Sequence, residues 1–406
     1  MPFPDDFEAP SLSEPEPLTV TEAQAALALG RLDGALAHCP EPVMRIFAGL
    51  MLQGTLIAAL RQEGHMFTEQ RFHAWFAGLT TLADETPRLA RSPRALCDAI
   101  LTELGHSSWE PLASLALRMQ PALLAPQDIL GEDAHEEALG VISDARQLLD
   151  TLAAEQSLLP LASLARLHHA VGRSIRFAPA ERSSAPIPYV GHGGGPMRGP
   201  MTGRPLTIER APSPSPRWAI ELLFGEHWRA AGIVRFALPW PGLIRLDALR
   251  HDNDDPAAAP IIRAATLRDL AQALFGKLAH AAKVTARIAG PMPGRRATSR
   301  APALFELLAG FGSLRSAQLE TLLGATRLGV RSMLDTLGDM GVLERTKVAG
   351  ALLYSVSRAD RPVYILSGPT DGIAFSSDAL SEFDASMDNI EQLLARSGTD
   401  LDDAEE

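Results

Sequence analysis

Residues 319–354 read LETLLGATRLGVRSMLDTLGDMGVLERTKVAGALLY, and the expected C-terminal fold follows from them. Val330, Met333, Leu334 and Leu337 recur at spacings of three and four, which predicts one buried face of a helix capped by Thr326. Gly324 is able to adopt the left-handed conformation of a tight turn, so it is expected to end an earlier helix. That earlier helix is predicted to run through Gln318 to Leu323, with Ser313 as its cap. The stretch therefore predicts two helices joined by a short turn.

The flanking residues extend this unit on both sides. Gly341 is expected to stop the second helix, and a hairpin is predicted after it, with strands over 342–345 and 352–356 and a turn over 348–350. Upstream, residues 302–311 predict a further helix with Leu304, Leu307 and Leu308 pointing inward. The predicted order is helix, helix, turn, helix, hairpin.

This order resembles the winged helix-turn-helix of many bacterial regulators, in which the hairpin is the wing. The matching positions are Leu322-Leu323-Gly324, Val330, Leu334, Leu337, Gly341-Val342-Leu343 and Arg345. The lead-in RRATSRAPALFELL (295–308) and the helical N-terminal half are similar to a family of uncharacterised bacterial proteins that join a helical domain of unknown function to a C-terminal helix-turn-helix. One departure is that Gly329 and Gly338 lie inside the second helix, where each costs about 1 kcal/mol relative to Ala.

The resemblance implies sequence-specific binding of double-stranded DNA, with the second helix in the major groove, and a role in transcription regulation. Arg327 and Arg331 are the expected base readers, with Ser332 beside them, because a bidentate arginine–guanine contact is worth about 1–3 kcal/mol of discrimination. Ser316 and Thr326 are expected to contact phosphates through hydroxyl groups or helix N-termini. The cations expected to hold the DNA backbone are Arg295, Arg296, Arg300, Arg345 and Lys347.

The distribution of charge bears on this expectation. The net charge of −12 opposes phosphate binding, which requires cations. However, residues 1–30 carry six acidic residues and no basic one, and residues 362–406 carry eleven acidic residues and one Arg. Residues 283–361 carry twelve Lys or Arg against six acidic residues, so the basic charge coincides with the predicted helix-turn-helix.

The whole chain is predicted to be mainly α, with a multi-helical N-terminal domain, a C-terminal winged helix-turn-helix and a short β-hairpin wing. Ala and Leu dominate the apolar residues and favour helices, whereas no alternation of strands and helices typical of a parallel-sheet enzyme is present. The expected divisions are a disordered acidic tail (1–18), a helical domain (19–175), a Pro/Gly-rich linker or loop (176–216), a second helical segment (217–294), the winged helix-turn-helix (295–358) and an acidic extension with an amphipathic helix (359–406).

Within these divisions, helices are expected at 19–39, 42–62, 69–82, 92–104, 108–120, 134–155, 160–173, 217–230 and 266–286. The helix over 42–62 is expected to bury one face, formed by Val43, Phe47, Leu50, Gly54 and Ile57. Thr266, with Asp269 three residues later, predicts a cap for the helix over 266–286. Residues 233–238 are interpreted as a short strand.

Composition also indicates a compartment. The two cysteines make no disulfide framework, no run of about 20 apolar residues predicts a membrane span, and the acidic, Pro-rich start lacks the features of a signal peptide. A cytoplasmic protein is the simplest expectation. Arg outnumbers Lys by 34 to 3, which favours a GC-rich bacterial genome.

Motifs for catalysis are weak. His192-Gly193-Gly194-Gly195 is similar to the oxyanion strip of some esterases, but no G-x-S-x-G nucleophile motif accompanies it, and a flexible loop is the expectation. His168-His169 and His227 have no partners at metal-ligand spacing, no P-loop is present, and Cys39 and Cys97 are expected to be core residues. We therefore expect no enzyme activity, cofactor or metal.

Alternatives stay open. Winged helices also serve as protein–protein modules without DNA. A degenerate Fic-type protein is a weaker possibility, because the His-Pro-Phe and Gly-Asn-Gly-Arg motifs are lacking. A homodimer and a small-molecule or protein effector are expected partners. The apolar stripe of Leu380, Phe383, Met387, Ile390 and Leu394 predicts a helix that packs on the body, forms a dimer contact or competes with DNA.

Overall fold

The computed structural model describes residues 18–80, 91–126, 131–153, 159–179, 184–186, 207–209, 215–249, 258–288 and 300–357. All of them belong to the first of two units, Met1–Val363 and Tyr364–Glu406. Several expectations lie outside the described residues: the tail over 1–17, the His192 strip, Arg295, Arg296 and the amphipathic stripe of the C-terminal extension.

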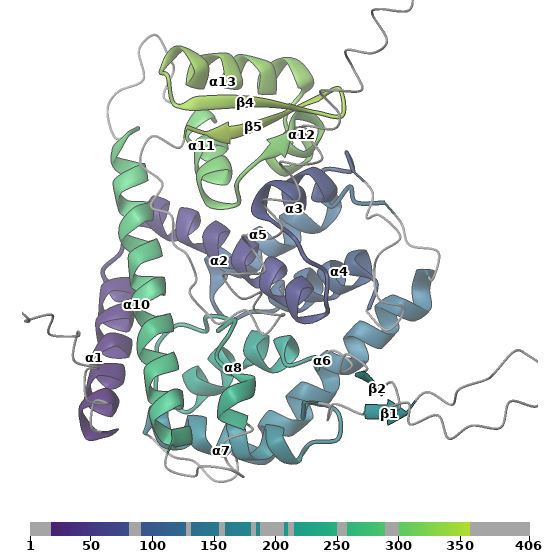
Figure 1. The fold of residues 1–406 in the computed structure, drawn as a ribbon. Helices are drawn as coiled ribbons and strands as arrows, with labels where there is room; N and C mark the ends of the chain where they lie inside the picture. The colour runs from purple at the N-terminus through teal and green to yellow at the C-terminus, as the bar shows by residue number, and fades with distance from the viewer. Residues whose placement is uncertain are drawn as a thin grey trace, which may run out of the picture. The chain divides into compact units, whose positions relative to one another are not determined.

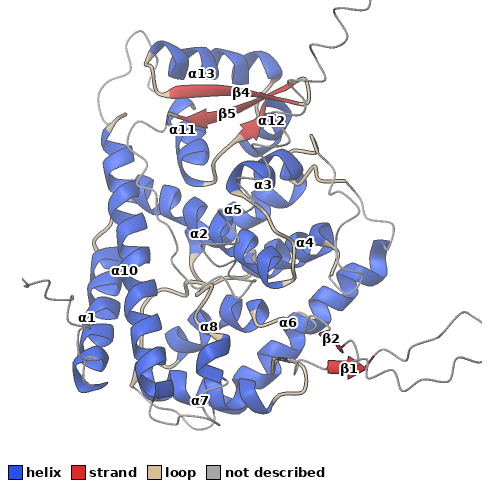
Figure 2. Ribbon diagram, viewed as in Figure 1, coloured by secondary structure: helices blue, strands red, loops and turns tan. Residues whose placement is uncertain are grey.

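The described residues are mainly helical, with small antiparallel sheets (Figure 1, Figure 2). The N-terminal helices are α1 (Leu18–Ala37), α2 (Glu41–Gln62), α3 (Glu69–Phe76), α4 (Pro93–Leu104), α5 (Glu110–Met119), η1 (Gln120–Ala122), α6 (Gly131–Ala153) and α7 (Pro160–Arg173). After them come β1 (Ser184–Pro186), β2 (Thr207–Glu209), α8 (Trp218–Ala230) and α10 (Ala258–Ala286). The C-terminal elements are α11 (Ala301–Gly310), β3 (Leu314–Arg315), α12 (Ser316–Leu323), α13 (Arg327–Asp339), β4 (Leu343–Val348) and β5 (Ala351–Val356). The predicted predominance of helix is thus confirmed.

Helix α2 is buried on nearly all sides. Of the predicted face, Val43, Phe47, Leu50 and Ile57 are buried and Gly54 is half-buried. Burial extends beyond this face, because α2 packs against α4, α5, α8, α10 and α11. No membrane span was expected from the sequence, although α2 is long and apolar enough to cross a membrane by length and composition. Its most apolar window is 83% buried inside the protein, which is typical of a central core helix.

Helix α10 is longer than expected, and it packs along α1 (Figure 1). It begins at Ala258, so Thr266 is not its cap. The Thr266 hydroxyl instead donates a hydrogen bond to the Ile262 carbonyl at 2.7 Å within the helix. Helix α3 is shorter than expected: it ends at Phe76, and Gly78 adopts a φ of 70° just after it.

The segment predicted as a strand over 233–238 is irregular, and this expectation is wrong. It packs on α8, with Val234 and Leu238 buried. The approach is so close that a Cβ added at Gly225 of α8 would lie 1.9 Å from the Leu238 carbonyl oxygen. Burial against a helix, rather than pairing with another strand, explains its apolar residues.

Two antiparallel sheets are present among the described residues. Strands β1 and β2 pair within the segment expected to be a linker or loop, with Ala185 opposite Ile208. The C-terminal sheet has the order β3-β5-β4. Tyr354 of the central strand β5 pairs with Leu314 of β3 on one side and with Arg345 of β4 on the other.

Candidate nucleic-acid interface

Residues 300–357, called here the C-terminal module, contain α11, β3, α12, α13, β4 and β5. The turn between α12 and α13 is formed by Gly324 with a φ of 54°, as expected from the sequence. No atom lies within 4 Å of a Cβ added there, so the requirement for glycine is conformational rather than steric. The Ala325 amide closes the turn by donating to the Glu320 carbonyl at 3.1 Å.

The start of α13 is fixed by Thr326. Its hydroxyl accepts a hydrogen bond from the Gly329 amide at 3.2 Å, which confirms the predicted cap. The start of α12 differs from the expectation of a Ser313 cap. Strand β3 intervenes, Arg315 is the N-cap residue, and its backbone N–H donates to Gln318 Oε1 at 3.0 Å.

The two faces of α13 separate cleanly. The predicted inward residues Val330, Met333, Leu334 and Leu337 are all buried. On the opposite side, the exposed residues are Arg327, Leu328, Arg331, Ser332, Asp335, Gly338 and Asp339. We call these residues the outer face of α13. The structure therefore brings the predicted base readers Arg327, Arg331 and Ser332 together on one exposed surface.

The remaining predicted contacts are more scattered. Thr326 is exposed at the start of α13, whereas Ser316 is half-buried at the start of α12. Arg300 is exposed, but its Nη1 donates to the Leu323 carbonyl at 2.8 Å, which gives it a structural role. These positions do not all join the outer face of α13.

The hairpin presents different residues on its two faces, because alternate residues of a strand point in opposite directions. Arg345 lies toward α13, where its Nη2 is 3.4 Å from Asp335 Oδ1. Lys347 is exposed two residues further along β4 and therefore shares that side. Glu344 and Thr346 line a cavity on the other side.

The opposite side of the module is joined to the helical body. Gly49 of α2 and Gly310 of α11 touch, and a Cβ added at Gly49 would lie 2.6 Å from the Gly310 carbonyl carbon. An ion pair joins Arg45 Nε to Glu306 Oε2 at 2.7 Å. The ring of Phe311, directly after α11, lies 5.0 Å from that of Phe76.

Two side chains of β3 and α12 strengthen this joint. Gln318 is 1% exposed, and its Nε2 donates to the Ala122 carbonyl at 2.8 Å and to the Phe76 carbonyl at 3.4 Å. Arg315 Nη1 donates to the Ala77 carbonyl at 3.2 Å. These contacts, together with the glycine contact and the Arg45–Glu306 pair, are called the inner joint. They hold α11 and α12 against α2, α3 and η1 while α13 stays outside.

A cavity of about 180 Å³ lies between α3, α10, α11 and the hairpin. Polar side chains from the body and the hairpin line it, among them Glu69, His73, His280, Arg287, Glu344 and Thr346. Gln53 Nε2 donates to Glu69 Oε1 at 2.8 Å beside it. Small-molecule sites are usually larger, about 300–1,000 Å³, so the volume alone does not identify a ligand.

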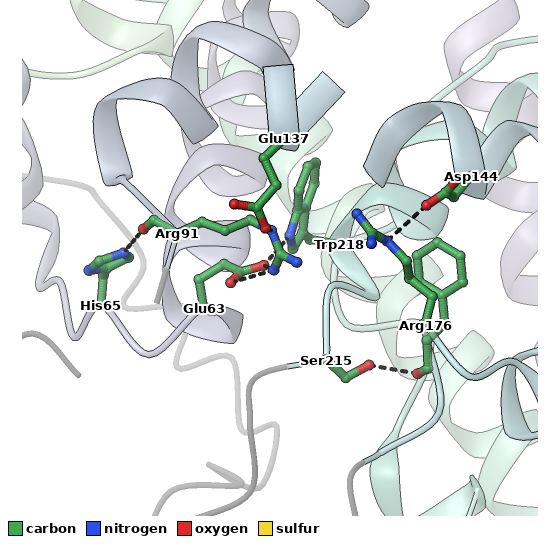
Figure 3. Close-up of polar contacts among 9 residues, drawn as sticks. Glu63, His65, Arg91, Glu137, Asp144, Arg176, Ser215 and Trp218 are labelled. Atoms are coloured by element: carbon green, nitrogen blue, oxygen red, sulfur yellow. Dashed lines mark hydrogen bonds and ion pairs between the residues drawn. The ribbon is translucent and has the colours of Figure 1, made fainter. Parts of the chain in front are cut away.

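A second cluster of polar residues lies in the helical body (Figure 3). Glu63, fully buried at the end of α2, accepts hydrogen bonds from Arg91 Nη1 at 2.7 and 2.9 Å and from Trp218 Nε1 at 2.6 Å. Arg91 Nε also lies 3.2 Å from Glu137 of α6. Since the donors Arg91 and Trp218 come from two separate segments and Arg91 also pairs with Glu137, the cluster joins α2, α6, α8 and the segment before α4.

Other contacts in the same view are also structural. Arg176 Nε pairs with Asp144 Oδ2 at 2.8 Å, and the Ser215 hydroxyl donates to the Phe177 carbonyl at 2.6 Å (Figure 3). These contacts anchor the ends of the segment between α7 and α8. The sequence did not indicate them, because each joins residues far apart in the chain.

Glu221 of α8 is a further buried carboxylate, with 2% of its surface exposed. It accepts hydrogen bonds from Gln62 Nε2 at 2.7 Å and from the Gly242 and Ile244 amides at 2.9 Å. Burial raises the pKa of this carboxyl, although the hydrogen bonds and the Arg217 charge oppose the rise. The group fastens residues 242–244 to α8.

The cysteines and histidines singled out in the sequence differ in burial: Cys97 and His168 are buried, Cys39 and His227 are half-buried, and His169 is exposed. Burial lowers the pKa of His227, with the Arg166 charge adding to the effect. Burial also raises the pKa of the Cys39 thiol. Within the described ranges, no three His, Cys, Asp or Glu side chains gather as a metal site.

Comparison with known proteins found no matching family model and no matching curated protein.

Three residues of the outer face were not predicted to lie on it: Leu328, Gly338 and Asp339. Leu328 lies between the predicted base readers in the sequence and is 77% exposed. The helical period that placed Val330 and Leu334 inward also places Leu328 outward, so this signal was available. The residues of the inner joint had no comparable signal, because their partners are more than a hundred residues away.

Proposed function

We propose that the C-terminal module is a winged helix-turn-helix that binds double-stranded DNA, and that the protein is a transcriptional regulator of the bacterial cytoplasm. The observation that carries the proposal is the exposure of Arg327 and Arg331 one helical turn apart on the outer face of α13. Two arginines at this spacing extend from the same side of a helix, as base reading in the major groove requires.

The dimensions and the hairpin support this proposal. Helix α13 has 13 residues and is about 20 Å long, while the major groove is about 12 Å wide. Entry by its N-terminal half would bring Arg327, Arg331 and Ser332 to base edges. Arg345 and Lys347, on the α13 side of the hairpin, would contact the phosphate backbone as part of the wing.

A specific observation favours a second function, a protein–protein module. Residues 300–357 carry six Arg or Lys and five Asp or Glu, so the described module is only weakly basic. Asp335 and Asp339 lie on the outer face itself, where they would repel phosphates. The two functions differ in their dependence on salt, because releasing counterions from DNA makes its binding weaken steeply as salt rises.

The test uses the full-length chain and a random duplex library. We expect enrichment of a duplex whose affinity falls with rising salt, and at least a tenfold loss of affinity for that duplex with Arg327→Ala plus Arg331→Ala. The matched control is Arg31→Ala plus Arg118→Ala, which removes two exposed arginines from α1 and α5. Equal losses in the two double variants, or no enriched duplex, would contradict DNA recognition by α13.

The same selection reports on assembly. A homodimer that reads paired half-sites would enrich inverted repeats spaced by about one helical turn of DNA. The helical body would then sense a signal or mediate self-association. The proposal assigns no catalytic residue, cofactor or metal to the chain.

A further inference from the structure

Leu328 is the most exposed large apolar residue of the C-terminal module, at 77%. Single exposed leucines are common on protein surfaces, so exposure alone carries little meaning. The position of Leu328 is more informative. It lies in the first turn of α13, directly after Arg327, in the half of the helix proposed to enter the groove.

The neighbours of Leu328 on α13 are polar. Residues three and four apart on a helix lie side by side, so Leu328 adjoins Arg331 and Ser332. Arg327 precedes it, and Asp335 lies one turn beyond Arg331 on the same face. The outer face therefore has one apolar point surrounded by hydrogen-bonding and charged groups.

This arrangement complements a base edge better than a protein surface. In the major groove, the apolar group that base edges offer is the C5-methyl of thymine, and hydrogen-bonding groups surround it. Stable protein interfaces bury about 800 Å² on each partner around an apolar centre. One leucine among two arginines, a serine and two aspartates is a small apolar centre for such an interface, whereas Arg327 and Arg331, the residues nearest to it in the first turns, complement DNA.

We infer that Leu328 is a specificity-determining residue that contacts the C5-methyl of a thymine next to bases read by Arg327 and Arg331. The inference rests on the proposed function and deepens it, because it names one base of the recognised sequence. It predicts that a thymine occupies a constant place in the selected duplexes, and that its methyl group contributes to affinity.

The experiment replaces each thymine of the selected duplex, one at a time, by deoxyuridine, which removes only the methyl group. With the unaltered full-length protein, we expect one replacement to weaken binding about fourfold, the change that corresponds to uncovering one methylene-sized group. Leu328→Ala should bind the thymine and deoxyuridine duplexes equally. The control Leu352→Ala, which truncates an exposed leucine of β5, should keep the fourfold difference.

The outcomes separate this inference from the proposed function. Failure to enrich any duplex would overturn both. An enriched duplex for which no deoxyuridine replacement changes the affinity would overturn the inference alone, and that measurement requires no protein variant. Loss of self-association in Leu328→Ala, measured by analytical ultracentrifugation with DNA affinity unchanged, would assign Leu328 to a protein contact and would also overturn the inference.

Discussion

The outer face of α13 and the inner joint belong to the same short module, yet they use similar residues in different ways. Arg315 at the inner joint donates to the Ala77 carbonyl, and Gln318 beside it is almost fully buried. Arg327 and Arg331 on the outer face are exposed. Polar groups at the joint need partners because burial without them costs free energy, whereas exposed arginines contribute little to stability.

This difference separates the basic residues of the module into those that hold the fold together and those that are free to contact a partner. Counting charges along the sequence places Arg300, Arg315, Arg327 and Arg331 in one basic segment. The structure separates them, because Arg300 and Arg315 donate to backbone carbonyls of other segments. Changes at the inner joint should therefore alter stability, and changes on the outer face should alter binding.

The largest effect is expected where the module touches the body most closely. In Gly49→Ala, the new methyl group would lie 2.6 Å from the backbone of Gly310, so two helices must move apart. We expect a loss of about 2–3 kcal/mol in the free energy of unfolding, measured by urea denaturation. The control Gly30→Ala adds a methyl group to α1 with no atom within 4 Å and should not destabilise the protein. Equal stability of the two variants would contradict the close contact.

A smaller effect is expected at Gln318. Gln318→Leu removes the buried side-chain amide that donates hydrogen bonds to the Phe76 and Ala122 carbonyls, so both carbonyl oxygens lose this donor. We expect a loss of about 2 kcal/mol in thermal or urea unfolding. Thr321→Val is the matched control on α12, because it removes an exposed side-chain bond to the Ala317 carbonyl and should change stability by less than about 0.5 kcal/mol. A neutral Gln318→Leu variant would show that α12 is not held by these bonds.

An intermediate case lies at the boundary between the two regions. Thr326→Ala removes the hydroxyl that caps α13, and we expect a loss of about 1 kcal/mol in the free energy of unfolding. Thr326→Ser keeps a capping oxygen and should retain most of that stability. If both variants lose the same amount, the hydroxyl oxygen does not stabilise the helix start.

The smallest effect on stability is expected for Arg327→Ala plus Arg331→Ala. Both side chains are exposed, so the free energy of unfolding should change by less than about 0.5 kcal/mol for each substitution. The same double variant is expected to lose DNA affinity, as proposed above. A large fall in the unfolding midpoint would show that these arginines serve the fold and would remove the contrast between the two faces.

Much of the local structure was predictable. The buried stripe of α13, its Thr326 cap and the Gly324 turn follow from spacing and from conformational preference, and the structure confirms them. The Ser313 cap, the Thr266 cap and the strand over 233–238 were wrong. In each of these cases a local pattern was overridden by a contact with another segment or by a longer helix.

The sequence alone determined which side of α13 is apolar. A helix repeats every 3.6 residues, and at that period Val330, Met333, Leu334 and Leu337 all fall on one side. Only the tertiary structure decided which polar residues remain on the surface. Arg300, Arg315 and Gln318 find their partners across the fold, and such pairings depend on how helices pack rather than on the order of residues near them.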